Sequence, residues 1–302
     1  HRFPTDAESR SFVKNVYYNL QADYSVYNYE QQDAGHKDDL FKYGYLGAFT
    51  RHMVRSYEDG QDDVIGLSGL IHNAYLDTLY SFNREEFNPI LANYTQQYYD
   101  LRNGQIRRFE DLSPVQGGLT NGLSPESVYG LWANAGGLQT GYNFSESTQL
   151  GINAHFSAYL GNHELKLGMQ YEQRFDRAFG VAPTSLWTIM RGLTNFHIEQ
   201  LDKKNPQAVY MNGLFMDTIN YFRLFDAESQ RTFDRNLRLA LGLDPNGLDY
   251  LLIDSYDFNT NTLVYYDKDM IKRTATLNGK LDINMFGADE LLNQGAELVS
   301  YF

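Results

Sequence analysis

Two long stretches of alternating polarity, residues 149–160 and 164–175, constrain the fold of this chain more than any other feature. In the first stretch the even positions are apolar, and in the second the odd positions are apolar, with Gln173 as the one interruption. A period of two indicates a β-strand, because successive side chains point to opposite faces. The apolar positions are Leu150, Ile152, Ala154, Phe156, Ala158 and Leu160, followed by Leu165, Leu167, Met169, Tyr171 and Phe175.

The change of parity between the two stretches predicts an antiparallel hairpin over residues 147–176. If Leu160 pairs with Leu165, the apolar residues of both strands share one face, and Asn162 and His163 form a two-residue turn. Asn tolerates the positive φ that such a turn requires. We therefore predict a tight turn at Asn162 and His163.

The length of this hairpin indicates its surroundings. Leu150 to Leu160 covers eleven residues, whereas strands of soluble domains usually have about five or six. A tilted strand that crosses a bilayer needs about nine to eleven. The pattern favours a hairpin in a bacterial outer membrane, and a long hairpin packed on a soluble core is the alternative.

A second hairpin is predicted over residues 1–52, with a periplasmic turn near 28–40. Its first strand has an apolar face of even positions, and its second strand, from residue 41 onward, has an aromatic face of odd positions. The long segments 53–146 and 177–302 then lie on the opposite side. Short periplasmic turns and longer extracellular loops are typical of outer-membrane barrels.

The expected fold class is therefore an all-β transmembrane barrel, of which this chain supplies about four strands. An open sheet edge cannot be left in lipid, so we expect the chain to be a fragment of a larger barrel. The residues predicted to face lipid are Val16, Tyr18, Leu20, Ala22, Tyr24, Val26, Leu150, Ile152, Ala154, Phe156, Ala158, Leu160, Leu165, Leu167, Met169 and Tyr171.

The long segments are predicted to contain short helices. One is expected after the N-cap Ser124, and another over 186–201 with apolar residues at helical spacing. A third is indicated by Phe233, Leu237, Ala240 and Leu241, with Gly242 as its stop signal. A fourth is predicted around 288–293.

The composition excludes several function classes. The chain has no cysteine, which excludes disulfides and thiolate metal sites, and its net charge of −13 disfavours nucleic acid. No catalytic or nucleotide-binding motif is found, so we expect no enzyme activity and no cofactor. Residues Asp244 to Asp249 have oxygen ligands at calcium-like intervals, for which a tight turn is the favoured interpretation and a calcium site in the loops the alternative.

Several segments resemble Oar-like TonB-dependent receptors from the outer membranes of Bacteroidota. The barrel of these receptors is similar to RFPTDAESRSFVKN, HKDDLFKYGYLGAFT and GYNFSESTQLGINAHFSAYLGNHELKLGMQYEQRFD. Their long extracellular loops are similar to SLWTIMRGLTNFHIEQLD, FDRNLRLALGLDPNGLDYLLIDSY and INMFGADELLNQGAELVSYF. The resemblance implies a plugged barrel of about twenty-two strands, although the plug is not recognisable in this sequence.

The family resemblance implies energised uptake of a ligand, with TonB acting through the plug. Outer-membrane lipid is the expected environment, and other outer-membrane proteins or a surface lipoprotein are further expected partners. The ligand is not indicated, and no ligand-binding residue follows from the matched segments. One alternative is a non-transporting outer-membrane component whose loops dock surface, secretion or barrel-assembly proteins. Another is a soluble β-rich protein that binds or hydrolyses carbohydrate.

Overall fold

The chain divides into two compact units, and 44% of its residues lie in β-strands. The computed structural model describes residues 1–5, 10–63, 65–102, 104–107, 109–112, 118–124, 141–292 and 299–301. We call His1–Gln31, Asn143–Gly180 and Ser300–Phe302 unit 1, and Gln32–Tyr142 and Val181–Val299 unit 2. Within the described residues the sheets do not close into a barrel.

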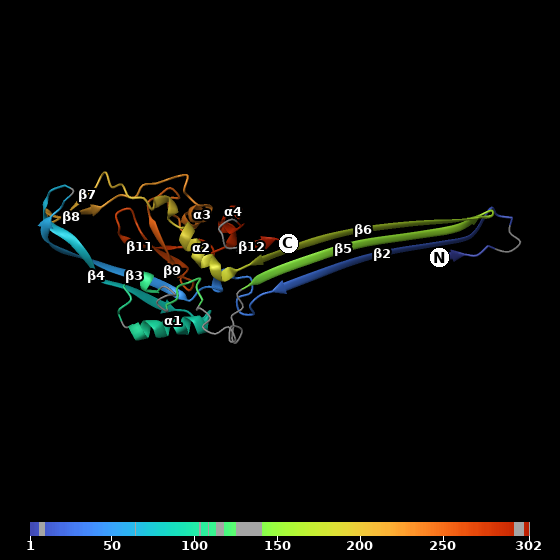
Figure 1. Ribbon diagram of the computed structural model, residues 1–302, viewed down its shortest axis with the longest axis horizontal. Helices are drawn as coiled ribbons and strands as arrows, with labels where there is room; N and C mark the ends of the chain where they lie inside the picture. The colour runs from blue at the N-terminus through green and yellow to red at the C-terminus, as the bar shows by residue number, and fades with distance from the viewer. Residues whose placement is uncertain are drawn as a thin grey trace. The chain divides into compact units, whose positions relative to one another are not determined.

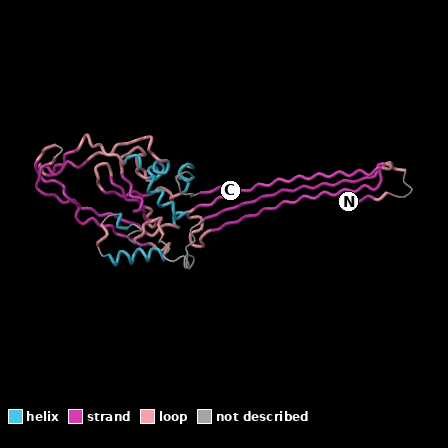
Figure 2. Tube along the Cα trace, in the orientation of Figure 1, coloured by secondary structure: helices cyan, strands magenta, loops and turns pink. Residues whose placement is uncertain are grey.

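Unit 1 is one sheet dominated by three long antiparallel strands, which lie side by side in Figures 1 and 2. These are β2 (Val13–Gln31), β5 (Tyr142–Leu160) and β6 (His163–Val181), each of 19 residues. Two short strands, β1 (Arg2–Phe3) and β12 (Val299–Tyr301), complete the order β1-β2-β5-β6-β12. The order in the sheet is therefore the order in the sequence.

The hairpin of β5 and β6 is confirmed, but its turn lies one residue earlier than predicted. Gly161 and Asn162 form the turn and His163 begins β6. Gly161 has a φ of +60°, which a type II′ turn requires at its first central position. Asn162 also tolerates positive φ, but Gly161 adopts it without a Cβ penalty, so the turn begins one residue earlier.

The earlier turn shifts the register by two residues, and side-chain contacts show the new pairing. Glu146 lies against Arg177 (Oε1 to Nη2, 2.9 Å), and a Cβ added to Gly168 would lie 3.4 Å from the ring of His155. Leu160 is thus not opposite Leu165. Because two residues are one full side-chain period, the apolar residues still share one face.

The predicted hairpin within residues 1–52 is wrong. β2 pairs with β5 along most of its length, whereas β3 (Gly47–Gln61) pairs with β4 (Ser68–Arg84) in a separate two-stranded sheet. Gln31 pairs with Asn143, so residues 28–40 lie at the end of the sheet where the long connections begin. They do not form the turn at the opposite end.

The aromatic residues that suggested the fourth strand belong to the core of unit 2. Phe41, Tyr43 and Tyr45 are all buried, and residues 40–42 form a 3-10 helix. Gly44 lies between Tyr43 and Tyr45 at a point of close packing. A Cβ at Gly44 would lie 2.7 Å from the carbonyl oxygen of Thr184, so the chain is packed closely there and does not extend as a strand.

Unit 2 contains both long segments, 32–142 and 181–299. Besides the β3–β4 hairpin it has a second hairpin and a three-stranded sheet in the order β11-β10-β9. Their bounds are β7 (Gln207–Met211), β8 (Leu214–Asn220), β9 (Tyr250–Asp257), β10 (Thr262–Tyr266) and β11 (Lys272–Thr276). The α-helices are α1 (Pro89–Arg102), α2 (Leu186–Leu193), α3 (Thr232–Ala240) and α4 (Ala288–Leu292), and 3-10 turns lie at 40–42, 109–112, 183–185, 196–198 and 283–285.

Three of the four predicted helices are present. The remaining one, predicted after Ser124, lies outside the described residues. α2 is shorter than predicted because Thr194 is extended and ends the helix at Leu193, and Asn195, with a left-handed φ of +65°, separates it from the 3-10 turn at 196–198. α3 ends as predicted at Gly242, whose φ is +70°. The N–H of Leu243 donates to the carbonyl of Arg238 and that of Gly242 to Leu239, which is a Schellman motif.

The two long segments share one core, although the sequence suggested two separate loops. Trp187, from the second segment, is fully buried, and its Nε1 donates to the carbonyl of Phe41 at 2.8 Å. The hydroxyl of Tyr45 donates to the carbonyl of Tyr256 at 2.7 Å, and its ring packs on Trp187 and Phe258. Unit 2 is therefore a single folded body made of both segments.

Candidate membrane-facing surface

The apolar residues of β2, β5 and β6 form one continuous face across unit 1. In the register of β2 and β5, Tyr18 lies opposite Phe156, Leu20 opposite Ala154, and Tyr24 opposite Leu150. Cross-strand neighbours share a face, so the predicted residues of the two strands are brought together. The odd apolar residues of β6 continue this face, because His155, on the other face of β5, lies over the even residue Gly168.

This face is exposed. Leu20 is 69% exposed, Tyr24 68% and Leu167 59%. Monomeric soluble proteins rarely leave a large contiguous apolar patch uncovered. The sequence pattern thus correctly predicted which residues lie together, and the structure shows that nothing among the described residues covers them as a core would.

A β-bulge shapes the end of the face near the tight turn. Val13 pairs with Leu160, but Tyr17 pairs with Ser157, so β2 has one extra residue between them. Asn15 lies in this bulge with a φ of +50°. The bulge changes the parity of β2, which lets the odd residue Val13 and the even residue Val16 lie on the same face.

Ala158 is the one predicted lipid-facing residue that is buried. The half-buried ones are Val16, Leu150, Ile152, Ala154 and Leu160, and the others are exposed. Ala158 lies across from the bulge of β2, where two residues of one strand oppose one residue of the other. The change from odd to even apolar positions between Val13 and Val16 is the sequence signal for the bulge, and the strand prediction did not use it.

The opposite face of unit 1 is polar. Gly151 lies against the carboxylate of Asp23, where a Cβ would come within 2.5 Å of Oδ1. Gln149 Nε2 donates to Glu172 Oε1 at 2.6 Å across β5 and β6. The sheet therefore separates an apolar face from a hydrogen-bonding face.

The two outer edges of the long strands have little pairing. Pairing of β1 with β2 is confined to Val16 and Tyr17. On the other side, β12 has three residues and β6 has 19, so most of that edge is uncovered by strands among the described residues. Unpaired edges of this length are strong sites for the addition of further strands.

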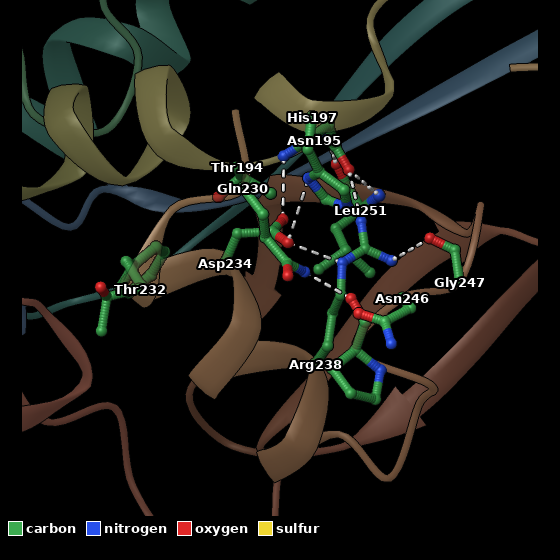
Figure 3. A network of polar contacts seen from close by, with 12 residues as sticks. Thr194, Asn195, His197, Gln230, Thr232, Asp234, Arg238, Asn246, Gly247 and Leu251 are labelled. Atoms are coloured by element: carbon green, nitrogen blue, oxygen red, sulfur yellow. Dashed lines mark hydrogen bonds and ion pairs between the residues drawn. The ribbon is translucent and has the colours of Figure 1, made fainter. Parts of the chain in front are cut away.

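A buried polar network in unit 2 is the second candidate site, shown in Figure 3. Asp234 and Arg238 of α3 are fully buried, and Arg238 Nε donates to Asp234 Oδ2 at 2.7 Å. The backbone N–H of Asn195 donates to Asp234 Oδ1 at 2.9 Å. The side chain of Asn195 in turn accepts from the N–H of Leu251 and donates to its carbonyl, both at 2.8 Å.

His197 borders this network without completing it. Its Nδ1 lies 3.4 Å from Asp234 Oδ2, and neither ring nitrogen makes a hydrogen bond. Burial lowers the pKa of His197, and this effect exceeds the opposing attraction of Asp234. The ring also packs edge-on against Phe225.

The network joins elements of the fold and does not form a reaction centre. It connects the 3-10 turn at 196–198, α3 and β9 through side chains that solvent does not reach. A substrate could not contact these groups, and each buried charge is engaged by a protein group. A second polar link, from Arg191 to both carboxylate oxygens of Asp254 (2.6 and 2.7 Å) and to the carbonyl of Asn121, joins the two segments of unit 2.

The segment considered for calcium forms the predicted turn. The N–H of Asn246 donates to Asp244 Oδ1 and that of Gly247 to the Asp244 carbonyl, both at 2.9 Å. In the part of the chain that the structure describes, no group of three or more His, Cys, Asp or Glu side chains is placed to hold a metal ion.

Among the described residues, no helix is long and apolar enough to cross a membrane. No protein-family model matches the chain, and no curated protein or solved structure compared with it matches either.

Proposed function

We propose that this chain is part of a TonB-dependent outer-membrane receptor, in which unit 1 spans the bilayer as barrel strands and unit 2 captures the ligand outside the cell. The observation that carries the proposal is the exposed, continuous apolar face of unit 1. The resemblance of several segments to Oar-like receptors supplies the transport assignment.

The apolar band has the height that a bilayer requires. From Val16 to Val26 the chain advances ten residues along β2, or about 33 Å at about 3.3 Å per residue. With a tilt of about 40°, the band is about 25 Å tall, which matches the apolar band of outer-membrane barrels.

The band ends in charged and polar residues on the same face. Asn28 follows Val26 by one side-chain period and pairs with Glu146, which is ion-paired to Arg177 at 2.9 Å. Charges are costly in the middle of a bilayer and are tolerated near its surface. The row of Asn28, Glu146 and Arg177 therefore supports a membrane boundary at this level.

The sheet order and the edges support a barrel. The strands of the unit 1 sheet lie side by side in the order in which they occur in the sequence, although β3 and β4 come between β2 and β5, and β7 to β11 come between β6 and β12. This order resembles the meander of an up-and-down barrel in which two connections are long. Unpaired backbone groups cannot remain in lipid, so the outer edges of β2 and β6 require neighbouring strands. Further barrel strands would supply them.

Unit 2 supports the ligand-capturing role by its position in the chain and its charge. Both of its segments leave unit 1 from the same end of the sheet, whereas the tight turn Gly161–Asn162 lies at the other end. Unit 2 carries 19 Lys and Arg against 30 Asp and Glu, and unit 1 carries 6 against 8. Most of the net negative charge therefore lies in the unit that would face the medium.

The experiment that tests this proposal is fractionation of the native membrane. We expect the protein to require detergent for extraction and to migrate differently on a denaturing gel with and without boiling, because folded barrels resist detergent. Protease added to intact cells should cut in unit 2 and leave unit 1 protected. Extraction without detergent would contradict the membrane assignment. Stoichiometric co-purification with other outer-membrane proteins, without energised uptake of a ligand, would favour the alternative of a non-transporting component whose loops dock those proteins.

A further inference from the structure

The β3–β4 hairpin ends in a turn that carries two exposed apolar residues. Asp62 closes this turn: its N–H donates to the carbonyl of Leu67 at 2.9 Å, and its Oδ1 accepts the N–H of Ile65 at 2.9 Å. Ile65 and Leu67 are both exposed. These hydrogen bonds hold Asp62, Ile65 and Leu67 in place, and the side chains of Ile65 and Leu67 are still presented outward.

The β7–β8 hairpin presents a second apolar tip. Its turn is Asn212–Gly213, with φ values of +51° and +81°, as in a type I′ turn. Met211 and Leu214 lie opposite each other beside this turn and are 54% and 64% exposed. Tyr210 is also exposed, and its ring packs edge-on against Phe215.

The two tips meet in unit 2, although they come from different long segments. A Cβ on Gly69 would lie within 2.5 Å of the Phe215 carbonyl oxygen, so only glycine allows the two hairpins to cross this closely. Leu67 is two residues from the crossing and Leu214 is one residue from it. Figure 1 shows the β7–β8 hairpin beside the end of the β3–β4 hairpin.

The two segments that form these tips carry charge of a single sign. Residues 56–83 and 205–222, which contain the two tips, include no Lys or Arg. The acidic residues in these ranges are Glu58, Asp59, Asp62, Asp63, Asp77 and Asp217. A partner that covers the apolar tips would therefore gain from positive charge at its rim.

We propose that the crossed hairpin tips bind a cationic amphipathic segment of another polypeptide. Its apolar side chains would cover Met211, Leu214 and Ile65, and its Lys or Arg side chains would lie near the exposed carboxylates of Asp59 and Asp63. The proposal deepens the proposed function, since it rests on unit 2 as the ligand-capturing part and names the chemical class of the ligand.

The test measures binding of defined peptides to the full chain. The probe is a labelled 14-residue peptide of alternating Leu and Lys blocks at helical spacing, compared with a Leu/Glu peptide and a Lys/Ser peptide of equal length. We expect the Leu/Lys peptide to bind at least tenfold more tightly than either comparison peptide, because both the apolar face and the positive charge are needed.

Two tip variants should weaken this binding. Met211→Ser with Leu214→Ser removes the apolar contact and should reduce affinity about tenfold. Asp59→Asn with Asp63→Asn should reduce affinity and flatten its dependence on salt, because screened charge attraction is removed. All four side chains are exposed, so the thermal unfolding of unit 2 should not change.

Matched controls keep the outcome decisive. Leu101→Ser changes an apolar side chain that is 86% exposed on α1, and Glu199→Gln with Glu228→Gln removes the same charge at exposed positions outside the two tip ranges. Both controls should bind the Leu/Lys peptide as the unchanged chain does. Equal losses in tip and control variants, or equal binding of the Leu/Glu peptide, would overturn the proposal. Loss of detergent dependence in the membrane experiment would instead overturn the proposed function, so the two failures are distinguishable.

Discussion

Units 1 and 2 differ in the solvent exposure of their apolar residues. In unit 2 they are buried, and the side chains of Trp187, Tyr45 and Phe233 are fully inaccessible to solvent. Unit 1 displays its apolar residues, with Leu20 and Tyr24 more than two-thirds exposed. Both units contain many aromatic and aliphatic residues, so their apolar content does not distinguish them.

The difference lies in the period of the pattern and in the charge. Unit 1 alternates with a period of two along strands of 19 residues and has nearly balanced charges, whereas unit 2 has short elements and most of the net negative charge. An apolar face that no described residue covers is stabilised when another apolar medium covers it. We therefore interpret the two units as adapted to two different solvents.

The largest effect is expected from breaking the buried ion pair of unit 2. Asp234→Asn leaves Arg238 charged and fully buried, which should lower the free energy of unfolding of unit 2 by about 3–5 kcal/mol. In a Trp132→Phe background, the fluorescence of Trp187, the remaining tryptophan of two, reports this unfolding in urea.

The control for this variant is a surface ion pair of the same unit. Glu86→Gln removes the partner of Arg84, and the side chain of Glu86 is 74% exposed. Its effect should stay below about 1 kcal/mol. Equal losses for the two variants would mean that the Asp234 network does not act as a buried charge pair.

The next largest effect should distinguish the two faces of unit 1. Ala154→Arg places a charge on the apolar face and should cost about 2–4 kcal/mol in a lipid-folding titration, because Arg is expensive near the bilayer midplane. Asn153→Arg places the same charge on the polar face and should be tolerated. Similar costs in lipid would contradict the assignment of the faces, and the same pair measured in urea without lipid shows whether the cost depends on the bilayer.

A smaller effect is expected at the helix ends of unit 2. Gly242→Ala forces a residue with a Cβ to adopt a φ of +70°, which should cost about 1–2 kcal/mol. Gly192→Ala, inside α2 where a Cβ meets no atom within 4 Å, should instead stabilise the helix by up to about 1 kcal/mol. Thermal unfolding of the two variants should move in opposite directions, and a shift in the same direction would contradict the role of Gly242 as the stop.

The smallest effect concerns pH. Burial lowers the pKa of His197 below its ordinary value of 6.5, and the positive charge of Arg238 lowers it further. The negative charges of Asp234 and Asp226 raise this pKa, but by less. The unfolded chain therefore binds a proton more readily than unit 2 does, so the stability that neutral His197 contributes is present above pH 6.5 and is lost as the pH falls below it.

Replacement of this histidine isolates its contribution. His197→Gln should flatten the loss of unit 2 stability between pH 7 and 5 in urea titrations, whereas His163→Gln at the exposed start of β6 should leave the loss unchanged. A stability that rises on acidification would mean that protonated His197 pairs with Asp234.

Local patterns predicted the local structure well. The alternation around Leu150 and Leu165 identified the hairpin and its apolar face, and Gly242 identified the end of α3. Such signals lie within a few residues of the element that they specify. The Asn212–Gly213 hairpin carried an equally strong signal, a tight-turn dipeptide between apolar residues, which the sequence analysis missed.

Distant pairings were not predictable in the same way. β2 pairs with β5 across more than 100 residues, and nothing in either strand excludes the nearer partner that the sequence suggested. The shared core of unit 2 likewise depends on Trp187 reaching Phe41. Alternation alone could not distinguish an aromatic strand face from a core segment at Phe41 and Tyr45, because both place large side chains at every second position.

The most direct test of the central claim is the accessibility of single spin labels along β5 in the native membrane environment. The chain has no cysteine, so Cys variants at positions 150 to 156 each carry one label. We predict a period of two, in which labels at Ile152 and Ala154 collide mainly with lipid-soluble oxygen and labels at Asn153 and His155 collide mainly with a water-soluble nickel chelate. Equal exposure of all positions to the nickel chelate would contradict the claim that the apolar face of unit 1 lies on lipid.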